Sequence, residues 1–229
     1  MNSDKSSKAI TIALVVIILG IFICLGIFGF QLLRDKNKEE AYTNAANEFE
    51  DMIISSKGSG KNNNGIAINS VDVPERGNKK MGDYDVIGTI EIPKVGLKSA
   101  ILDRTTTKSL EMAITFMYST SGLNKPGTTV LYGHNYRNSL LFSRNDELVN
   151  GDIVKVLDKD GNKVTYEIYG SQRTTSTDTS AYARTAEVTG GVCELVLSTC
   201  TDDADKTDGR LLLFCKEKSR EEVGTEDNN

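Results

Sequence analysis

An apolar segment near the N-terminus constrains this chain more than any other feature. Ala9–Phe30 is a run of about 22 residues without a charged side chain, long enough to cross the hydrocarbon core of a bilayer as a helix. A cleaved signal peptide would have a shorter apolar region and then a small-residue cleavage site, whereas this run continues into Gln31–Arg34. The segment therefore predicts an uncleaved signal-anchor at residues 9–30, after a cytoplasmic tail at residues 1–8.

The charges that flank this segment do not fix its orientation. Lys5 and Lys8 precede it, while Arg34, Lys36 and Lys38 follow it, so the positive-inside rule is balanced or mildly adverse. An extracellular C-terminal domain is therefore an expectation that depends on the chemistry below.

Polar segments lie on both sides of the part expected to be folded. Residues 31–81 predict a polar helix, with Ala45, Phe49 and Ile53 at roughly helical spacing, and then a linker rich in Ser, Gly, Asn and Lys. Residues 218–229 predict a disordered acidic tail. The net charge of −5 leaves no basic footprint for nucleic acid.

Residues 82–217 alternate short apolar runs with tight turns. The sequence DKDGN at Asp158–Asn162 is a strong hairpin signal. About seven or eight strands in roughly 135 residues predict a mostly β domain, a closed or nearly closed barrel with short helices. The expected strands are Val86–Ile92, Gly96–Leu102, Thr128–Tyr132, Asp152–Leu157, Lys163–Tyr169, Cys193–Cys200 and Arg210–Lys216, with short helices at Thr107–Ile114 and Ser139–Leu148 and a polar loop at Ser171–Gly191.

The four cysteines are too few and too unevenly spaced for a disulfide framework. Cys24 lies in the apolar segment, Cys193 and Cys215 lie inside expected strands, and Cys200 lies at a strand end. A Cys193–Cys215 bridge is one alternative, although buried free thiols are favoured. No cluster has metal-ligand spacing, so neither a metal nor a cofactor is expected.

Three reactive side chains occupy strand ends in this one domain. Cys200 ends one strand, Arg210 begins the next, and His134, the single histidine, follows the strand at Thr128–Tyr132. An imidazole can raise the thiolate fraction of a cysteine and later protonate a leaving amine. A guanidinium can donate hydrogen bonds to a developing oxyanion. Taken singly, the three have ordinary structural explanations: a loop histidine, a packed cysteine and a solvated arginine. Together they suffice for acyl transfer through a thioester.

The motifs around these residues resemble those of the sortase family. Leu197–Cys200, reading LSTC and followed by Arg210, is similar to the family's TLxTC…R signature, although Val196 stands where the family has Thr. The resemblance also includes Tyr132–Asn135, Ile90–Leu97 with its IPKV, and the segment from Leu141 to Asp152, all in family order. It covers roughly residues 85–216 and leaves the class open, with class D or class B as the leading candidates.

The resemblance implies an eight-stranded sortase-type barrel tethered to the membrane of a Gram-positive bacterium, with the domain outside. Cys200 would attack the Thr carbonyl of an LPxTG-like sorting signal on a secreted surface protein. Arg210 would stabilise the oxyanion, His134 would transfer the proton, and Thr199 would help to position the peptide. The acceptor would be an amine of a peptidoglycan cross-bridge or of a pilin lysine, and no cofactor is implied.

Two other readings remain at this point. The same Cys and His would serve another cysteine peptidase or an L,D-transpeptidase, although Thr199 stands where the latter's S-x-G-C run has Gly. A membrane-anchored, non-catalytic wall-binding domain is the alternative from a different class of protein.

Overall fold

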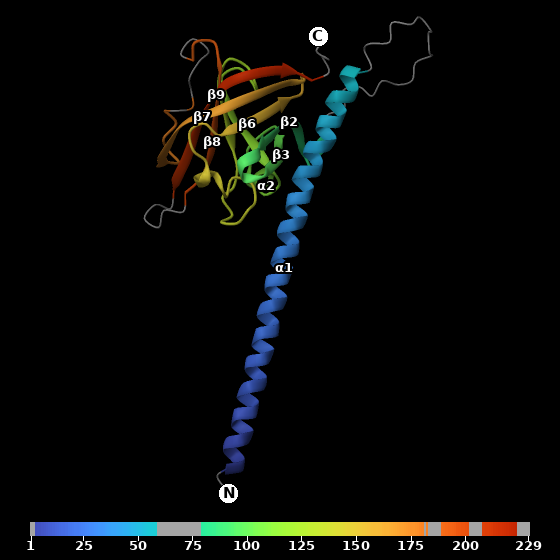
Figure 1. Ribbon diagram of the computed structural model, residues 1–229, viewed down its shortest axis with the longest axis vertical. Coiled ribbons are helices and arrows are strands. Elements are labelled where there is room, and N and C mark those ends of the chain that lie inside the picture. Colours follow the sequence, from blue (N-terminus) through green and yellow to red (C-terminus); the bar gives the residue numbers. More distant parts are fainter. Residues whose placement is uncertain (1–2, 59–78, 181, 183–188, 202–207, 224–229) are drawn as a thin grey trace, which may run out of the picture. The chain divides into compact units, whose positions relative to one another are not determined.

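A computed structural model gives the structure of the chain and describes residues 3–58, 79–180, 182, 189–201 and 208–223 (Figure 1). The chain divides into two compact units, Met1–Glu40 and Ala41–Asn229. The helices are α1 (Ser3–Gly58) and α2 (Thr107–Leu110), with 3-10 helices η1 (Pro93–Val95) and η2 (Asn145–Glu147). The strands are β1 (Lys80–Met81), β2 (Tyr84–Ile92), β3 (Leu97–Leu102), β4 (Ile114–Ser119), β5 (Gly127–Tyr132), β6 (Ile153–Asp158), β7 (Asn162–Thr175), β8 (Cys193–Cys200) and β9 (Gly209–Glu222).

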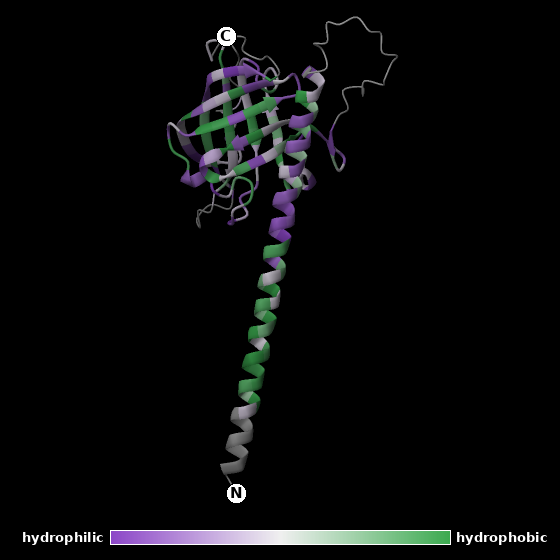
Figure 2. Ribbon diagram, turned by 45° about the vertical axis from the view of Figure 1, so that its right-hand side comes forward, coloured by the Kyte–Doolittle hydropathy of each residue, from purple (hydrophilic) through white to green (hydrophobic). Residues whose placement is uncertain are grey.

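The first unit is the N-terminal part of α1. Its large apolar side chains are exposed, from Ile12 at 65% to Phe30 at 68%, and Figure 2 shows this part of the helix as predominantly hydrophobic. Within Thr11–Lys57, α1 contains a window long and apolar enough to cross a membrane. The polar helix expected within residues 31–81 is present as the later part of α1. The predicted linker falls largely on residues 59–78, outside the described residues.

The C-terminal turns of α1 belong to the second unit and to its core. Phe49 is 1% exposed and Ala46 is fully buried. The Thr43 hydroxyl donates to the Lys98 carbonyl at 3.1 Å, and Lys98 Nζ donates to Glu50 at 2.7 Å. Apolar burial and these polar contacts fasten α1 to β3, so the folded unit begins well before the predicted residue 82.

The strands of the second unit close into a ring. Their order is β1-β2-β3-β4-β5-β8-β9-β7-β6, and β6 also pairs with β2, which closes eight strands with the short β1 appended to β2. The predicted mostly β, eight-stranded barrel is confirmed. Closure removes the free sheet edges that would otherwise be open to pairing with another chain.

One parallel pairing positions the candidate site. β5 and β8 run parallel, with Leu131 opposite Leu197 and Tyr132 opposite Ser198. Parallel strands end at the same edge of a sheet, so the residues that follow Tyr132 lie beside the last residues of β8. β8 and β9 pair antiparallel with Cys200 opposite Arg210, which brings the start of β9 to the same edge.

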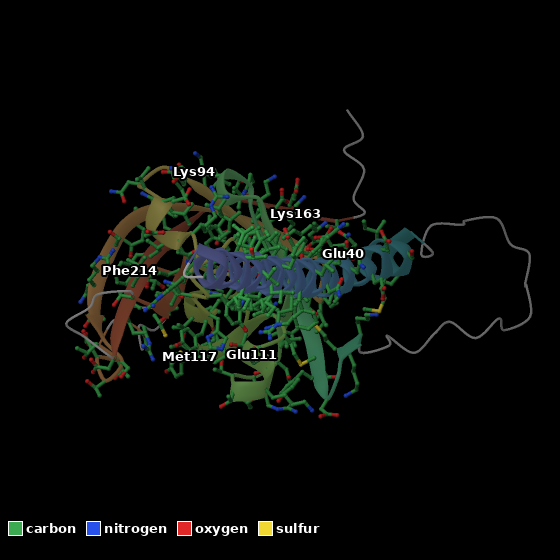
Figure 3. The ribbon with its side chains drawn as sticks, turned by 90° about the horizontal axis from the view of Figure 1, so that it is seen from below. Glu40, Lys94, Glu111, Met117, Lys163 and Phe214 are labelled. Carbon is green, nitrogen blue, oxygen red and sulfur yellow. The ribbon has the colours of Figure 1, made fainter. Side chains whose placement is uncertain are left out.

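Side chains alternate between the two faces of this part of the sheet. Leu195, Leu197 and Leu213 belong to the main core. Val130, Val196 and Leu212 point to the other face of these strands and form a second apolar cluster with Tyr182, which lies outside the strands. Phe214 packs against this cluster (Phe214 is labelled in Figure 3). By this alternation, Tyr132, Cys200 and Arg210 share the face of the second cluster.

Several elements differ from those expected. The helix predicted at Thr107–Ile114 ends at Leu110, and Ile114–Ser119 forms β4, which was not predicted. The short helical turn predicted at Ser139–Leu148 is present as η2. β7 continues to Thr175, into the predicted loop, because it pairs with β9 along its whole length. β9 itself continues to Glu222, so the tail predicted from residue 218 begins as strand.

Candidate active site

The end of β8 presents Cys200 beside the first residues of β9. Cys200 is partly exposed, and its partner across the two strands is Arg210. The Thr201 amide donates to the Gly209 carbonyl at 3.1 Å, which extends the pairing past the thiol. The Arg210 guanidinium donates to its neighbour's carbonyl, Gly209 O, at 3.0 Å. The expected juxtaposition of a thiol and a guanidinium is therefore present at this edge.

Tyr132, which the sequence reasoning missed, contacts the sulfur directly. Its Oη lies 3.1 Å from Cys200 Sγ, within hydrogen-bonding distance. The Arg210 guanidinium lies over the Tyr132 ring, 5.4 Å from its centroid, at cation–π distance. Burial, followed by the hydrogen bond to Cys200, raises the pKa of Tyr132 to about 12. The phenol is therefore protonated at neutral pH and can donate to a thiolate.

Tyr132 of β5 lies opposite Ser198 of β8. His134 and Cys200 each follow two residues later in their own segments, so they occupy matching positions. The backbone holds these two ends together, since Gly133 N donates to Ser198 O at 3.2 Å. The Asn135 amide donates to Cys200 O, also at 3.2 Å. The structure thus brings the His134 segment and the Cys200 segment to one edge of the barrel.

The His134 imidazole packs among polar and aromatic side chains. Its Nε2 lies 3.6 Å from the Glu111 carboxylate, and its ring centroid lies 4.9 Å from that of Tyr136 (Glu111 is labelled in Figure 3). Tyr136 in turn donates to Glu111 at 2.8 Å. The Glu111 carboxylate and the Tyr136 ring therefore both lie against the imidazole. Glu111 follows α2, and no sequence motif pointed to it.

Gly133 and Thr199 allow the His134 segment to pack closely against the Cys200 segment. A Cβ on Gly133 would lie 2.6 Å from Ile114 Cδ1 and 2.7 Å from Phe142 Cδ2, so only glycine fits there without rearrangement. The Thr199 side chain is 2% exposed, and its hydroxyl donates to Gly133 O at 2.8 Å. Thr199, expected to position substrate, fastens the histidine segment in this structure.

The other cysteines differ from Cys200 in environment. All four are free thiols, so the alternative Cys193–Cys215 bridge is absent. Burial raises the pKa of Cys193 to about 12, and full burial raises that of Cys215 well above its ordinary value. Cys24 is exposed on the apolar part of α1. Among the described residues of the second unit, Cys200 is the cysteine that is both accessible and surrounded by polar groups.

A cavity of about 120 Å³ opens beside the thiol. Cys200, Thr199 and Thr201 form one wall. The rest of its lining comes from the segment after His134 and from β7 and β9, namely Asn135, Phe142, Ser143, Asp146, Arg173 and Leu211. In the described part of the chain, no group of three or more His, Cys, Asp or Glu side chains could hold a metal ion.

The chain is similar to known proteins over most of the barrel. A family profile described as "Sortase domain" matches residues 90–218, more than half of the chain. The comparison with curated proteins gave no match.

Solved structures share the fold. Sortase A of Listeria monocytogenes is 24% identical over 61% of this chain and 92% of its own, with a TM-score of 0.53. The sortase D5 transpeptidase of Clostridium perfringens is 25% identical over 59% of this chain and 80% of its own, with a TM-score of 0.51. Sortase A of Corynebacterium diphtheriae is 19% identical over 87% of this chain and 98% of its own, with a TM-score of 0.54. Similar structures come from classes A, C, D, E and F, so the class is not resolved. The profile match, on a closed barrel with these motifs at one edge, shows that the chain belongs to the sortase family.

Proposed function

We propose that this protein is a cysteine transpeptidase that cleaves an LPxTG-like sorting signal and joins the released protein to an amine. The observation that carries the proposal is the meeting of Cys200, Arg210 and the His134 segment at one edge of the barrel. Family membership supports sortase activity, and the sorting-signal variant and the acceptor are part of the proposal.

The proposed reaction has two halves. The Cys200 thiolate attacks the Thr carbonyl carbon of the Thr–Gly bond, and the resulting oxyanion accepts hydrogen bonds from Arg210. His134 gives a proton to the departing Gly nitrogen, the C–N bond breaks, and a thioester remains on Cys200. An incoming amine then attacks the thioester carbonyl and loses a proton to His134. The C–S bond breaks, and the Cys200 thiolate is restored.

The partners and the location follow from the same proposal. The donors are secreted surface proteins with a C-terminal sorting signal, and the acceptors are cross-bridge or pilin amines. Residues 9–30 cross the membrane once and the barrel lies outside, with residues 1–8 in the cytoplasm. A protease added to intact cells should therefore digest the barrel, and a barrel that stays intact until the cells are lysed would contradict this orientation.

The nucleophile is tested by replacing Cys200 in the full chain, solubilised in detergent. Cys200→Ala should abolish cleavage of a sorting-signal peptide and the stimulation of that cleavage by hydroxylamine. Cys24→Ala is the matched control, because it removes an exposed thiol from the apolar helix and should leave the rate unchanged. Cleavage by Cys200→Ala at the unaltered rate would remove Cys200 from the mechanism, whereas no cleavage by the original chain would favour a binding domain.

A further inference from the structure

A second cavity adjoins the one beside Cys200. It has a volume of about 220 Å³, and it shares Asp146, Arg173 and Leu211 with the first cavity. The rest of its lining is Asn145 of η2, Leu148 directly after η2, Ser171 of β7 and Leu213 of β9. The two cavities therefore form one cleft, which leads from Cys200 to Asn145.

Asn145 is the unusual residue of this cleft. Its side chain is 1% exposed, and neither its amide nitrogen nor its amide oxygen has a hydrogen-bond partner in the described structure. Thr201, at the other end of the cleft, also has a buried hydroxyl oxygen without a partner among the described residues. A buried polar group without a partner costs free energy of folding, so such groups are rare and concentrate where a ligand or water completes them.

We propose that this cleft binds the acceptor of the transfer reaction, as a short peptide that carries a free amine. The inference rests on the proposed function. One carboxamide offers a donor and an acceptor together, which matches the C=O and N–H of an extended peptide. Asp146, on the wall shared by both cavities, supplies a carboxylate for the ammonium group of a peptide amine before it is deprotonated.

The position of the cleft allows the acyl donor and the acceptor peptide to bind on different surfaces. The cleft is lined by Thr199 and Leu211, whose side chains lie on the other face of β8 and β9 from Cys200 and Arg210. The acyl donor has to lie with its carbonyl near Arg210, so an acceptor in the cleft would not compete for the same surface. Asn135 and Ser143, which follow His134 in the chain, form part of the cleft wall, so the cleft reaches the segment that carries the proposed base.

Asn145→Leu tests the proposal in the full chain. Leucine fills a similar volume and removes both polar atoms, so the variant should unfold at the same or a higher temperature. Hydroxylamine is too small to need the cleft, and hydroxylamine-dependent cleavage should stay within about twofold of the original rate. Transfer to triglycine should lose about tenfold or more in kcat/KM, through KM, because the two hydrogen bonds are lost.

Two further variants complete the experiment. Asn150→Leu makes the same replacement at an exposed position of the same segment and should change neither reaction. Asp146→Asn alters an exposed residue, so folding is not at stake, and it should weaken transfer to triglycine without slowing hydroxylamine-dependent cleavage.

The outcomes are distinct. Unchanged transfer to triglycine in both Asn145→Leu and Asp146→Asn would mean that the cleft holds only water, and would overturn the inference. A raised KM for the sorting-signal peptide would assign the cleft to the donor and would also overturn it. An original chain with no hydroxylamine-dependent cleavage would instead refute the proposed function, on which the inference rests.

Discussion

Replacing Tyr132 with Phe isolates one hydrogen bond at Cys200, the proposed nucleophile. Phenylalanine keeps the ring beneath the Arg210 guanidinium and removes only the hydroxyl that lies 3.1 Å from Cys200 Sγ. A hydrogen bond to a charged group contributes about 1.5–3 kcal/mol. Cys200 is partly exposed, so the lower value applies, and a loss of about 1.5 kcal/mol corresponds to a roughly tenfold slower attack by the sulfur.

The loss is partly offset by the reactivity of the sulfur itself. A sulfur anion that has lost a hydrogen bond is intrinsically more nucleophilic, with a Brønsted coefficient of about 0.4–0.5, so about half of the loss is recovered. At about pH 7 the variant should therefore be alkylated about threefold more slowly than the original chain.

The assay is the rate of iodoacetamide labelling of Cys200 at about pH 7, followed by mass spectrometry of the tryptic peptide. Tyr118→Phe is the control, because Tyr118 is a 40% exposed phenol on the neighbouring strand β4, and its replacement should leave the labelling rate unchanged. A Tyr132→Phe variant that is labelled as fast as the original chain, or faster, would refute a hydrogen bond from Tyr132 to the reacting sulfur.

Three other perturbations test the packing and selectivity of the site. Gly133→Ala places a Cβ 2.6–2.7 Å from two buried side chains, so the rate of sorting-peptide cleavage should fall at least tenfold. A rate near the original would show that the backbone around His134 can shift to accommodate the Cβ. Phe49→Ala removes a side chain that is 1% exposed and should lower the free energy of unfolding by about 3–5 kcal/mol, measured by denaturant titration. An unchanged denaturation midpoint would show that α1 does not contribute to the folded core. Brief alkylation of the native protein at neutral pH should label Cys200 before Cys193 or Cys215, because burial raises the pKa of the Cys193 and Cys215 thiols. Equal labelling of the three cysteines would contradict the burial of Cys193 and Cys215.

The sequence predicted the features that depend on local pattern. Apolar runs bounded by turns placed β5, β8 and the β6–β7 hairpin within a few residues, and the change from apolar to polar sequence at Cys200 marked the true end of β8. These features depend on side-chain alternation and turn chemistry, which neighbouring residues express directly.

Long-range pairing decided what the sequence could not show. The second half of β7, Ser171–Thr175, is polar and exposed or half-buried, yet it is strand because Leu211–Leu213 of β9 pair with it. β4 was missed for a similar reason, since the helical start signal at Thr107 was extended through Ile114, which instead pairs with Ile101 of β3. Strand propensity is a weak guide where the partner strand supplies most of the stabilisation.

The same limit explains the missed residues of the site. Tyr132 and Cys200 share a face only because β5 and β8 are parallel and Tyr132 lies opposite Ser198. A one-residue shift of that register would turn the phenol to the other face of the sheet. Glu111 reaches His134 from a separate turn, and nothing in the local sequence announces that contact.

The parallel pairing of β5 with β8 also has a kinetic consequence. β6 and β7 lie between these two strands in the chain and pair elsewhere in the ring, so the pair forms only after a long loop has closed. Loop closure of this kind is slow, and it comes late when non-local contacts dominate a β fold. Until β5 and β8 have paired, Cys200 has neither Tyr132 nor the His134 segment beside it. Under the proposed function, activity would therefore appear only after this non-local pairing has formed.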